Sequence, residues 1–212
     1  MVALLTKPLE AYTPVAVLAL DNYPNVMRLL DYATRVRVAK TIASAVIKRG
    51  KSLGSSEKVS KLFSFLSPLV KDEPDAPARD SEEDDEEFLE EQSLVARLVH
   101  LVDSKDTDVA YQMYDTLRQL FAQGGEHRAK HTLVPLMFSA LRLAKRVKAR
   151  EEAGDTVQVS CKKVFGLCHD IGTTAAPLVP TLALPLFLQA VQVSAAAGFE
   201  AIAYEFFTQV CS

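Results

Sequence analysis

Apolar residues recur every three or four positions along most of this chain, which is the spacing of one face of an α-helix. Strand-like alternation of apolar and polar residues is nearly absent. The eight glycines and ten prolines lie mostly at the edges of the periodic segments, where such residues end helices. The pattern therefore predicts an all-α fold, with helices at about 2–12, 24–31, 33–48, 56–71, 89–103, 107–122, 128–149, 156–175, 181–197 and 199–212.

The predicted helices follow one another at a regular interval. Many are about 15 to 20 residues long, and the short turns between them give a period of roughly 40 residues per pair. Stacked helix hairpins have this period. No strict consensus repeat is present, so we expect a HEAT-like α-solenoid of stacked antiparallel helix hairpins. The short turns also permit a closed helical bundle, which stays open as the alternative.

Two of the predicted helices carry a clear apolar stripe. Residues on one face of a helix bury that face against a neighbour, so we expect both stripes to lie in the core. Pro135 lies in the second of these helices, where we expect a proline to be tolerated only near the first turn. The stripes comprise Val59, Leu62, Phe63, Leu66, Leu69 and Val70 in the first helix, and Leu133, Leu136, Met137, Ala140, Leu141 and Ala144 in the second.

An acidic block separates two groups of predicted helices. From Asp72 to Glu91 the chain has twelve acidic residues and one basic residue, Arg79. Outside the block it has 23 basic and 15 acidic residues, although its formal net charge is −3. A run of like charge repels itself and is typically a solvated linker; the alternative is that it binds a basic segment of a partner or of the chain itself. We expect helical repeats at 1–71, an acidic flexible linker at 72–88, and further repeats at 89–212 that continue the solenoid.

The composition bears on the compartment and on targeting. The three cysteines, Cys161, Cys168 and Cys211, have irregular spacing and do not form a disulfide framework, so we expect reduced, buried thiols in the cytoplasm. Lys7 and Pro8 interrupt the first apolar run, which is too short for a signal peptide or a membrane span. Both ends fall within amphipathic patterns, so we expect the chain to be a fragment of a longer protein.

Two histidines have the spacing of a metal site. His127 and His131 lie four residues apart and could share a helix face, as two zinc ligands do. Arg128 stands where a zinc protease has its glutamate base, and Lys130 adds positive charge that opposes a cation. The pattern favours the solvated start of a helix over a metal site. Gly124-Gly125 lacks the strand and the lysine of a phosphate-binding loop.

The segment Cys168-His169-Asp170 contains a nucleophile, a base and an acid in sequence. Adjacent residues of a helix point about 100° apart, and the members of a catalytic triad normally come from separate elements. The pattern therefore favours a buried Cys168 beside a surface His169. We expect neither catalytic residues nor a bound metal or cofactor, and hence no enzyme.

A basic cluster closes the predicted helix 128–149. Cations near a helix C-terminus interact favourably with its dipole, by about 0.3–1 kcal/mol each, which accounts for most of the cluster. The alternative is that Arg142, Lys145 and Arg146 contact an acidic surface, either a phosphoinositide membrane or the acidic patch of a partner. Aromatic residues do not interleave with the cluster, so we do not expect nucleic-acid binding. The cluster comprises Arg142, Lys145, Arg146, Lys148 and Arg150.

Several segments carry more specific information: Glu91–Arg97, Gly124–Arg128, Thr132–Phe138, Leu184–Gln189 and Ala203–Phe206. In order and spacing they closely resemble the large α-solenoid subunit of retromer, the vacuolar protein sorting-associated protein 35 family. The resemblance extends back through Pro8–Tyr12 and Leu30–Tyr32 and so covers essentially the whole chain. It indicates a middle portion of that subunit, in a fungal or other lower-eukaryotic version.

The resemblance implies a non-enzymatic scaffold of retromer, the endosomal coat that recycles membrane proteins to the Golgi or the plasma membrane. It implies a cytosolic protein on the endosome, attached peripherally through the coat. The family binds a metallophosphoesterase-fold subunit (protein 29) through its C-terminal half, of which only the earlier helices are expected here. The arrestin-like subunit (protein 26) binds an N-terminal region absent here, and sorting nexins and cargo are further implied partners. Another HEAT-type scaffold, such as a nuclear transport receptor with acidic loops, is the alternative.

Overall fold

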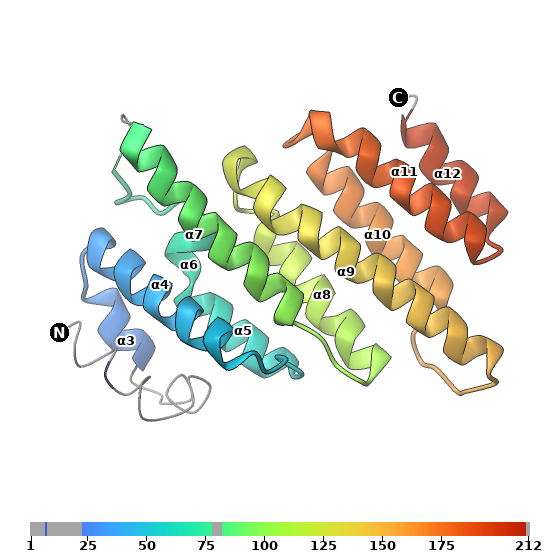
Figure 1. Cartoon of the computed structure of the whole chain (residues 1–212), viewed down its shortest axis with the longest axis horizontal. Coiled ribbons are helices and arrows are strands. Elements are labelled where there is room, and N and C mark those ends of the chain that lie inside the picture. The colour runs from blue at the N-terminus through green and yellow to red at the C-terminus, as the bar shows by residue number, and fades with distance from the viewer. Residues whose placement is uncertain (1–6, 8–22, 78–81, 211–212) are drawn as a thin grey trace. The chain divides into compact units, whose positions relative to one another are not determined.

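The computed structural model describes residues 7, 23–77 and 82–210, and all regular structure in that part of the chain is α-helical (Figure 1). The all-α class expected from the sequence is therefore confirmed, while the helix expected at about 2–12 lies outside the described residues. Contacts between residues divide the chain into two compact units, Met1–Asp103 and Ser104–Ser212. In this division the helix that follows the acidic block groups with the helices before it.

The first unit is built around two long helices that lie side by side. α4 and α7 run in the same direction, and α6 contacts both of them (Figure 1). The Asp31 carboxylate caps α4 by accepting a hydrogen bond from the Thr34 backbone N–H at 2.9 Å. Gly50 ends α4 with φ 61°, in the left-handed region that favours glycine. The described helices of this unit are α3 (Tyr23–Arg28), α4 (Tyr32–Arg49), α5 (Ser56–Phe65), α6 (Ser67–Val70) and α7 (Glu82–Leu101).

The single helix expected at 56–71 is wrong, because this segment forms two helices, α5 and α6. They meet at a turn at Leu66, and Pro68 lies in the first turn of α6. Proline has no backbone N–H, so it cannot continue the hydrogen-bond ladder of the preceding helix but is accepted in the first turn of a new one. The predicted apolar stripe is nevertheless buried at all six positions: Val59, Leu62, Phe63, Leu66, Leu69 and Val70.

The helix after the acidic block begins earlier than expected. α7 starts at Glu82 instead of about 89, so the acidic residues from Glu82 onward are helical. Glutamate has a high helix propensity, and acidic side chains in the first turns interact favourably with the positive end of the helix dipole. These local preferences extend α7 into a charge run that repulsion alone would leave irregular. The described residues from Asp72 to Pro77, in contrast, are not helical.

The second unit is a series of antiparallel helices (Figure 1). α9 contacts α8 and α10, and α11 contacts α10 and α12. Contacts between α9 and α11, and between α8 and α10, place alternate helices in two layers. The second unit therefore has the stacked-hairpin arrangement that the sequence predicted. Its helices are α8 (Thr107–Phe121), α9 (Glu126–Glu152), α10 (Cys161–Ala175), α11 (Pro180–Ala196) and α12 (Glu200–Val210).

The central helix of this unit, α9, spans 27 residues and contains Pro135 well inside its length. The expectation that Pro135 is tolerated only near the first turn is therefore wrong. Pro135 is buried, and so are its neighbours Leu133 and Leu136, so tertiary packing outweighs the local cost of proline. The predicted stripe is confirmed, since all six of its residues are buried.

Aromatic side chains join the last three helices. Phe206 of α12 lies 6.4 Å from Phe165 of α10 and 6.3 Å from Phe187 of α11, between ring centroids. Phe187 also lies directly over Gly172 of α10, where a Cβ atom would approach its ring to 2.6 Å. Ring atoms of a buried phenylalanine cannot shift by the required distance without repacking. Glycine at position 172 is therefore what allows α10 and α11 to approach each other closely.

We predict that Gly172→Ala destabilises the chain by about 1–3 kcal/mol, because the added methyl group overpacks the contact with Phe187. Urea denaturation followed by circular dichroism measures this change. Replacing Phe187 by leucine in the Gly172→Ala background should recover part of the loss, since it removes the ring that the methyl group meets.

The control is Gly166→Ala on the same helix. Apart from the adjacent backbone of α10 itself, nothing lies within 4 Å of a Cβ placed at Gly166, so this change should leave stability unchanged or raise it by about 0.5–1 kcal/mol through the higher helix propensity of alanine. Equal effects of the two substitutions would contradict the packing argument.

Candidate interaction surfaces

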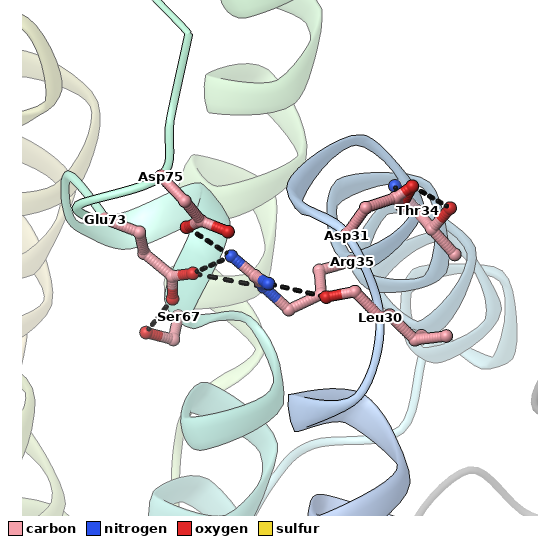
Figure 2. A network of polar contacts seen from close by, with 7 residues as sticks. All are labelled: Leu30, Asp31, Thr34, Arg35, Ser67, Glu73 and Asp75. Atoms are coloured by element: carbon pink, nitrogen blue, oxygen red, sulfur yellow. Dashed lines mark hydrogen bonds and ion pairs between the residues drawn. The ribbon is translucent and has the colours of Figure 1, made fainter.

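An arginine on α4 binds the start of the acidic block (Figure 2). The Arg35 Nη2 atom lies 2.7 Å from Glu73 Oε2 and 2.6 Å from Asp75 Oδ1. Its Nη1 donates to the Leu30 carbonyl at 2.7 Å, and the Ser67 hydroxyl donates to Glu73 Oε1 at 2.9 Å. The network connects α4, α6 and the irregular segment that follows α6.

The two acidic residues of this network are thus held by the first unit. The side chains of Arg35 and Glu73 are only 14% and 17% exposed, so water screens this ion pair less than a fully exposed one. The hydrogen bond from Arg35 lowers the pKa of Asp75, and the bond to Asp75 raises the pKa of Arg35. Both acidic residues lie in the segment where the sequence favoured a linker, and this pairing corresponds to the alternative in which the block binds a basic residue of the chain itself.

A second set of contacts holds α7 against α4 and α6. Lys40 Nζ lies 2.8 Å from Glu87 Oε1 and 3.7 Å from Glu91 Oε1. Burial alone would lower the pKa of Lys40, but the hydrogen bond to Glu87 and the nearby carboxylates together raise it. The buried Gln92 side chain donates to the Leu69 carbonyl at 2.8 Å. The beginning of α7 is therefore tied to the body of the first unit by charge as well as by apolar packing.

The residues of the basic cluster of α9 have two different roles. Arg146 donates to the carbonyls of Ser104 and Lys105, and Arg150 Nη1 donates to Thr107 Oγ1 at 2.7 Å. These bonds hold the segment that leads into α8 against α9, so they give a structural role that the helix-dipole argument did not identify.

The remaining members of the predicted contact set face solvent. Arg142 and Lys145 are exposed, and Arg142 donates only to Ser139 Oγ within its own helix, at 3.2 Å, among its described hydrogen bonds. Phe138, which is 42% exposed, lies four residues before Arg142 and seven before Lys145, so the three share one face of α9. The structure thus brings Arg142 and Lys145 together with an exposed aromatic side chain, and assigns Arg146 largely to a backbone contact.

The members of Cys168-His169-Asp170 and the other cysteine of α10 differ in their surroundings. Burial raises the pKa of the Cys161 thiol to about 11, and it raises that of Cys168 above its ordinary range. The His169 ring lies 6.1 Å from the Phe206 ring between centroids, and His169, the exposed Asp170 and Glu205 line one hollow. Within residues 23–77 and 82–210, no group of three or more histidine, cysteine, aspartate or glutamate side chains is arranged to hold a metal ion.

The two histidines of α9 have different surroundings. His127 is exposed, and burial lowers the pKa of the half-buried His131. The sequence favoured a solvated helix start here, which the position of His127 in the first turn of α9 fits.

None of the helices in the described part of the chain combines the length and apolar character that a membrane crossing requires.

Comparison with known proteins identifies the family. The family described as vacuolar protein sorting-associated protein 35 (Vps35) matches residues 1–212. The chain belongs to the Vps35 family. Vacuolar protein sorting-associated protein 35B of Arabidopsis thaliana is 35% identical over 213 residues, covering 99% of this chain and 27% of that protein. The Dictyostelium discoideum protein is 34% identical over 201 residues, covering 91% of this chain and 26% of that protein, and the Schizosaccharomyces pombe protein is 24% identical over 197 residues, covering 92% and 22%.

Membership of the Vps35 family confirms the resemblance found in the sequence, and the all-α hairpins of the two units agree with the α-solenoid class of that family. The chain spans about a quarter of the length of these Vps35 relatives. The roles given above to individual residues rest on the geometry of this chain.

The centre of the polar network in Figure 2, Arg35, was not among the expected site residues. Arg35 and Glu73 are 38 positions apart, and nothing in the local pattern of either segment indicates the pairing. The only available signal was the general one that a basic body and an acidic block attract each other.

We predict that Arg35→Gln destabilises the chain at pH 7 and much less at pH 3. The pKa of Asp75 is lower in the folded state than its ordinary value of 3.8. Its ion pair with Arg35 therefore contributes fully to the free energy of unfolding above pH 3.8, and this contribution is lost as the pH falls through the lower pKa of the folded state. Urea denaturation midpoints of the parent and the variant at both pH values measure the difference. Arg37→Gln is the matched control, because Arg37 is exposed on the same helix; a loss of equal size in both variants would contradict a specific network.

Proposed function

We propose that this chain is a scaffold segment of retromer, the endosomal coat that supports retrograde and recycling transport of membrane cargo. The observation that carries the proposal is the match to the Vps35 family over the whole chain. Stacked helix hairpins support it physically, since they present extended surfaces on which other subunits can bind. The chain covers only 27% of its Arabidopsis relative, so the proposal concerns the role of the whole protein to which this segment contributes.

A scaffold role without catalysis is part of the proposal. Its support is the surroundings of Cys168 and His169: burial raises the pKa of the Cys168 thiol, and the His169 ring packs against the Phe206 ring. A catalytic relay requires nucleophile, base and acid within hydrogen-bond reach.

Within the coat, we infer contact with the metallophosphoesterase-fold subunit (protein 29), to which this chain contributes part of the surface. The arrestin-like subunit (protein 26) binds the full-length protein outside this chain, and sorting nexins and cargo are further partners. The protein works at the cytosolic face of endosomes and associates with the membrane peripherally through the coat, without nucleic acid. The family match favours this function over that of a nuclear transport receptor.

A binding experiment tests the scaffold proposal. The immobilised chain and the immobilised full-length protein are each offered the metallophosphoesterase-fold subunit and, separately, a basic nuclear import peptide. We expect both baits to retain the subunit, the chain more weakly because it carries part of the surface, and neither to retain the peptide. Retention of the import peptide without the subunit would contradict the retromer function and support the transport-receptor alternative.

We also propose that Arg142 and Lys145 contact an anionic surface, with Arg146 contributing less because it binds backbone carbonyls. The observation that favours it is the exposed face of α9, where Phe138 lies beside the two cations. An aromatic side chain next to basic residues suits the boundary of a phosphoinositide membrane, since the ring enters the interface while the cations bind phosphate groups.

We predict that Arg142→Glu with Lys145→Glu reduces co-sedimentation with phosphatidylcholine vesicles containing phosphatidylinositol phosphate by at least about thirtyfold, because each of the two lost cations contributes about 1 kcal/mol near such a surface and the glutamates add repulsion. Vesicles of phosphatidylcholine alone should bind neither protein. The control, Lys51→Glu with Lys58→Glu, makes the same charge change at exposed positions of the first unit. Unchanged binding of the Arg142 and Lys145 variant, or equal losses in both variants, would contradict a specific contact.

A further inference from the structure

A groove lies between α4 and α7 on the first unit. It consists of two hollows of about 670 and 720 Å³, which adjoin because Lys40 and Ser44 line both of them. Short side chains on α4, including Ala33 and Ser44, leave the hollows open.

The α7 wall of the groove exposes an apolar side chain. Leu89 is 47% exposed, and Leu94, which is half-buried, lines the same hollow. Leu89 lies between exposed acidic residues of α7, so apolar surface and negative charge adjoin on this wall. The groove therefore contains apolar surface that a partner could cover.

The net charge of this wall is negative. Glu86 and Glu90 flank Leu89 in the hollow, and both carboxylates are exposed. Lys40, the cation in the middle of the groove, is already paired with Glu87 at 2.8 Å and lies 3.7 Å from Glu91. The other cation, Arg37, lines the hollow that contains neither Glu86 nor Glu90. The charged groups that a partner would meet beside Leu89 are therefore the carboxylates of Glu86 and Glu90.

We propose that this groove binds an amphipathic helix of a partner protein whose apolar face is bordered by lysine or arginine. Leu89 and the short side chains of α4 would receive the apolar face, and Glu86 and Glu90 would pair with the basic border. A helix suits the site because the groove runs between two parallel helices, and an amphipathic helix can lay its apolar face into such a groove. This inference does not depend on the retromer function and concerns a different helix pair from the α9 surface.

The test uses a fluorescein-labelled peptide with two repeats of Leu-Lys-Lys-Leu-Leu-Lys-Leu and measures its anisotropy against the full chain. We expect saturable binding with one peptide per chain. Leu89→Ala should weaken it about tenfold, which corresponds to the loss of one buried leucine contact. Glu86→Lys with Glu90→Lys should weaken it at least about tenfold by replacing two attractive pairs with two repulsive ones.

Matched controls separate the groove from general attraction. Leu29→Ala removes another exposed leucine of the first unit, 76% exposed and outside the groove, and Glu200→Lys with Glu205→Lys reverses two exposed charges on α12. Neither control should change the affinity, and a peptide with glutamate in place of lysine should not bind. Thermal melts by circular dichroism show that each variant is folded.

Four results would overturn the proposal. If the peptide shows no saturable binding, the groove does not bind a basic amphipathic helix. If Leu89→Ala binds the peptide as tightly as the parent chain does, the interaction is purely electrostatic. If the control variants lose as much affinity for the peptide as the groove variants do, the binding is not specific to the groove. The fourth result is a dimer of the chain that Leu89→Glu converts to a monomer and that the peptide does not disrupt. In that case a second copy of this chain occupies the groove.

Discussion

The structure depends on one constraint, which is that most of its helices have more apolar surface than a single neighbour can cover. α9 buries residues on several sides and contacts both α8 and α10. α11 buries Leu186, Phe187 and Ala190 against other helices of its unit while Leu184 and Leu188 remain exposed. Burying one such leucine is worth about 1.5–3 kcal/mol. Stacking of successive hairpins is the arrangement that satisfies this demand, because each helix then has neighbours in both directions.

Charged residues also stabilise the structure, because they bind irregular segments to the helices. Arg35 holds Glu73 and Asp75, and Arg146 and Arg150 hold the segment before α8. A buried backbone carbonyl or carboxylate without a partner is costly, so a long arginine side chain that reaches it stabilises the turn. The cations used in this way are not available to partners, whereas Arg142 and Lys145 are exposed.

Sequence reasoning succeeded where a local rule decides the outcome. The apolar stripes of 56–71 and 128–149 are buried as predicted. It failed where two rules compete. Pro68 divides one predicted helix while Pro135 is accommodated inside another, although both prolines are buried. The position of the basic cluster was predictable, but its division into structural and exposed members was not.

The sequence by itself determined the all-α class, the buried faces of the long helices and the family, because helical spacing and the order of residues are properties of the chain alone. Only the tertiary structure decided that α7 groups with the helices before it, that Arg35 binds the acidic block, and that Leu89 and its neighbouring glutamates border an open groove. These features join residues far apart in the chain, and their energies depend on distances that exist only after the helices have packed.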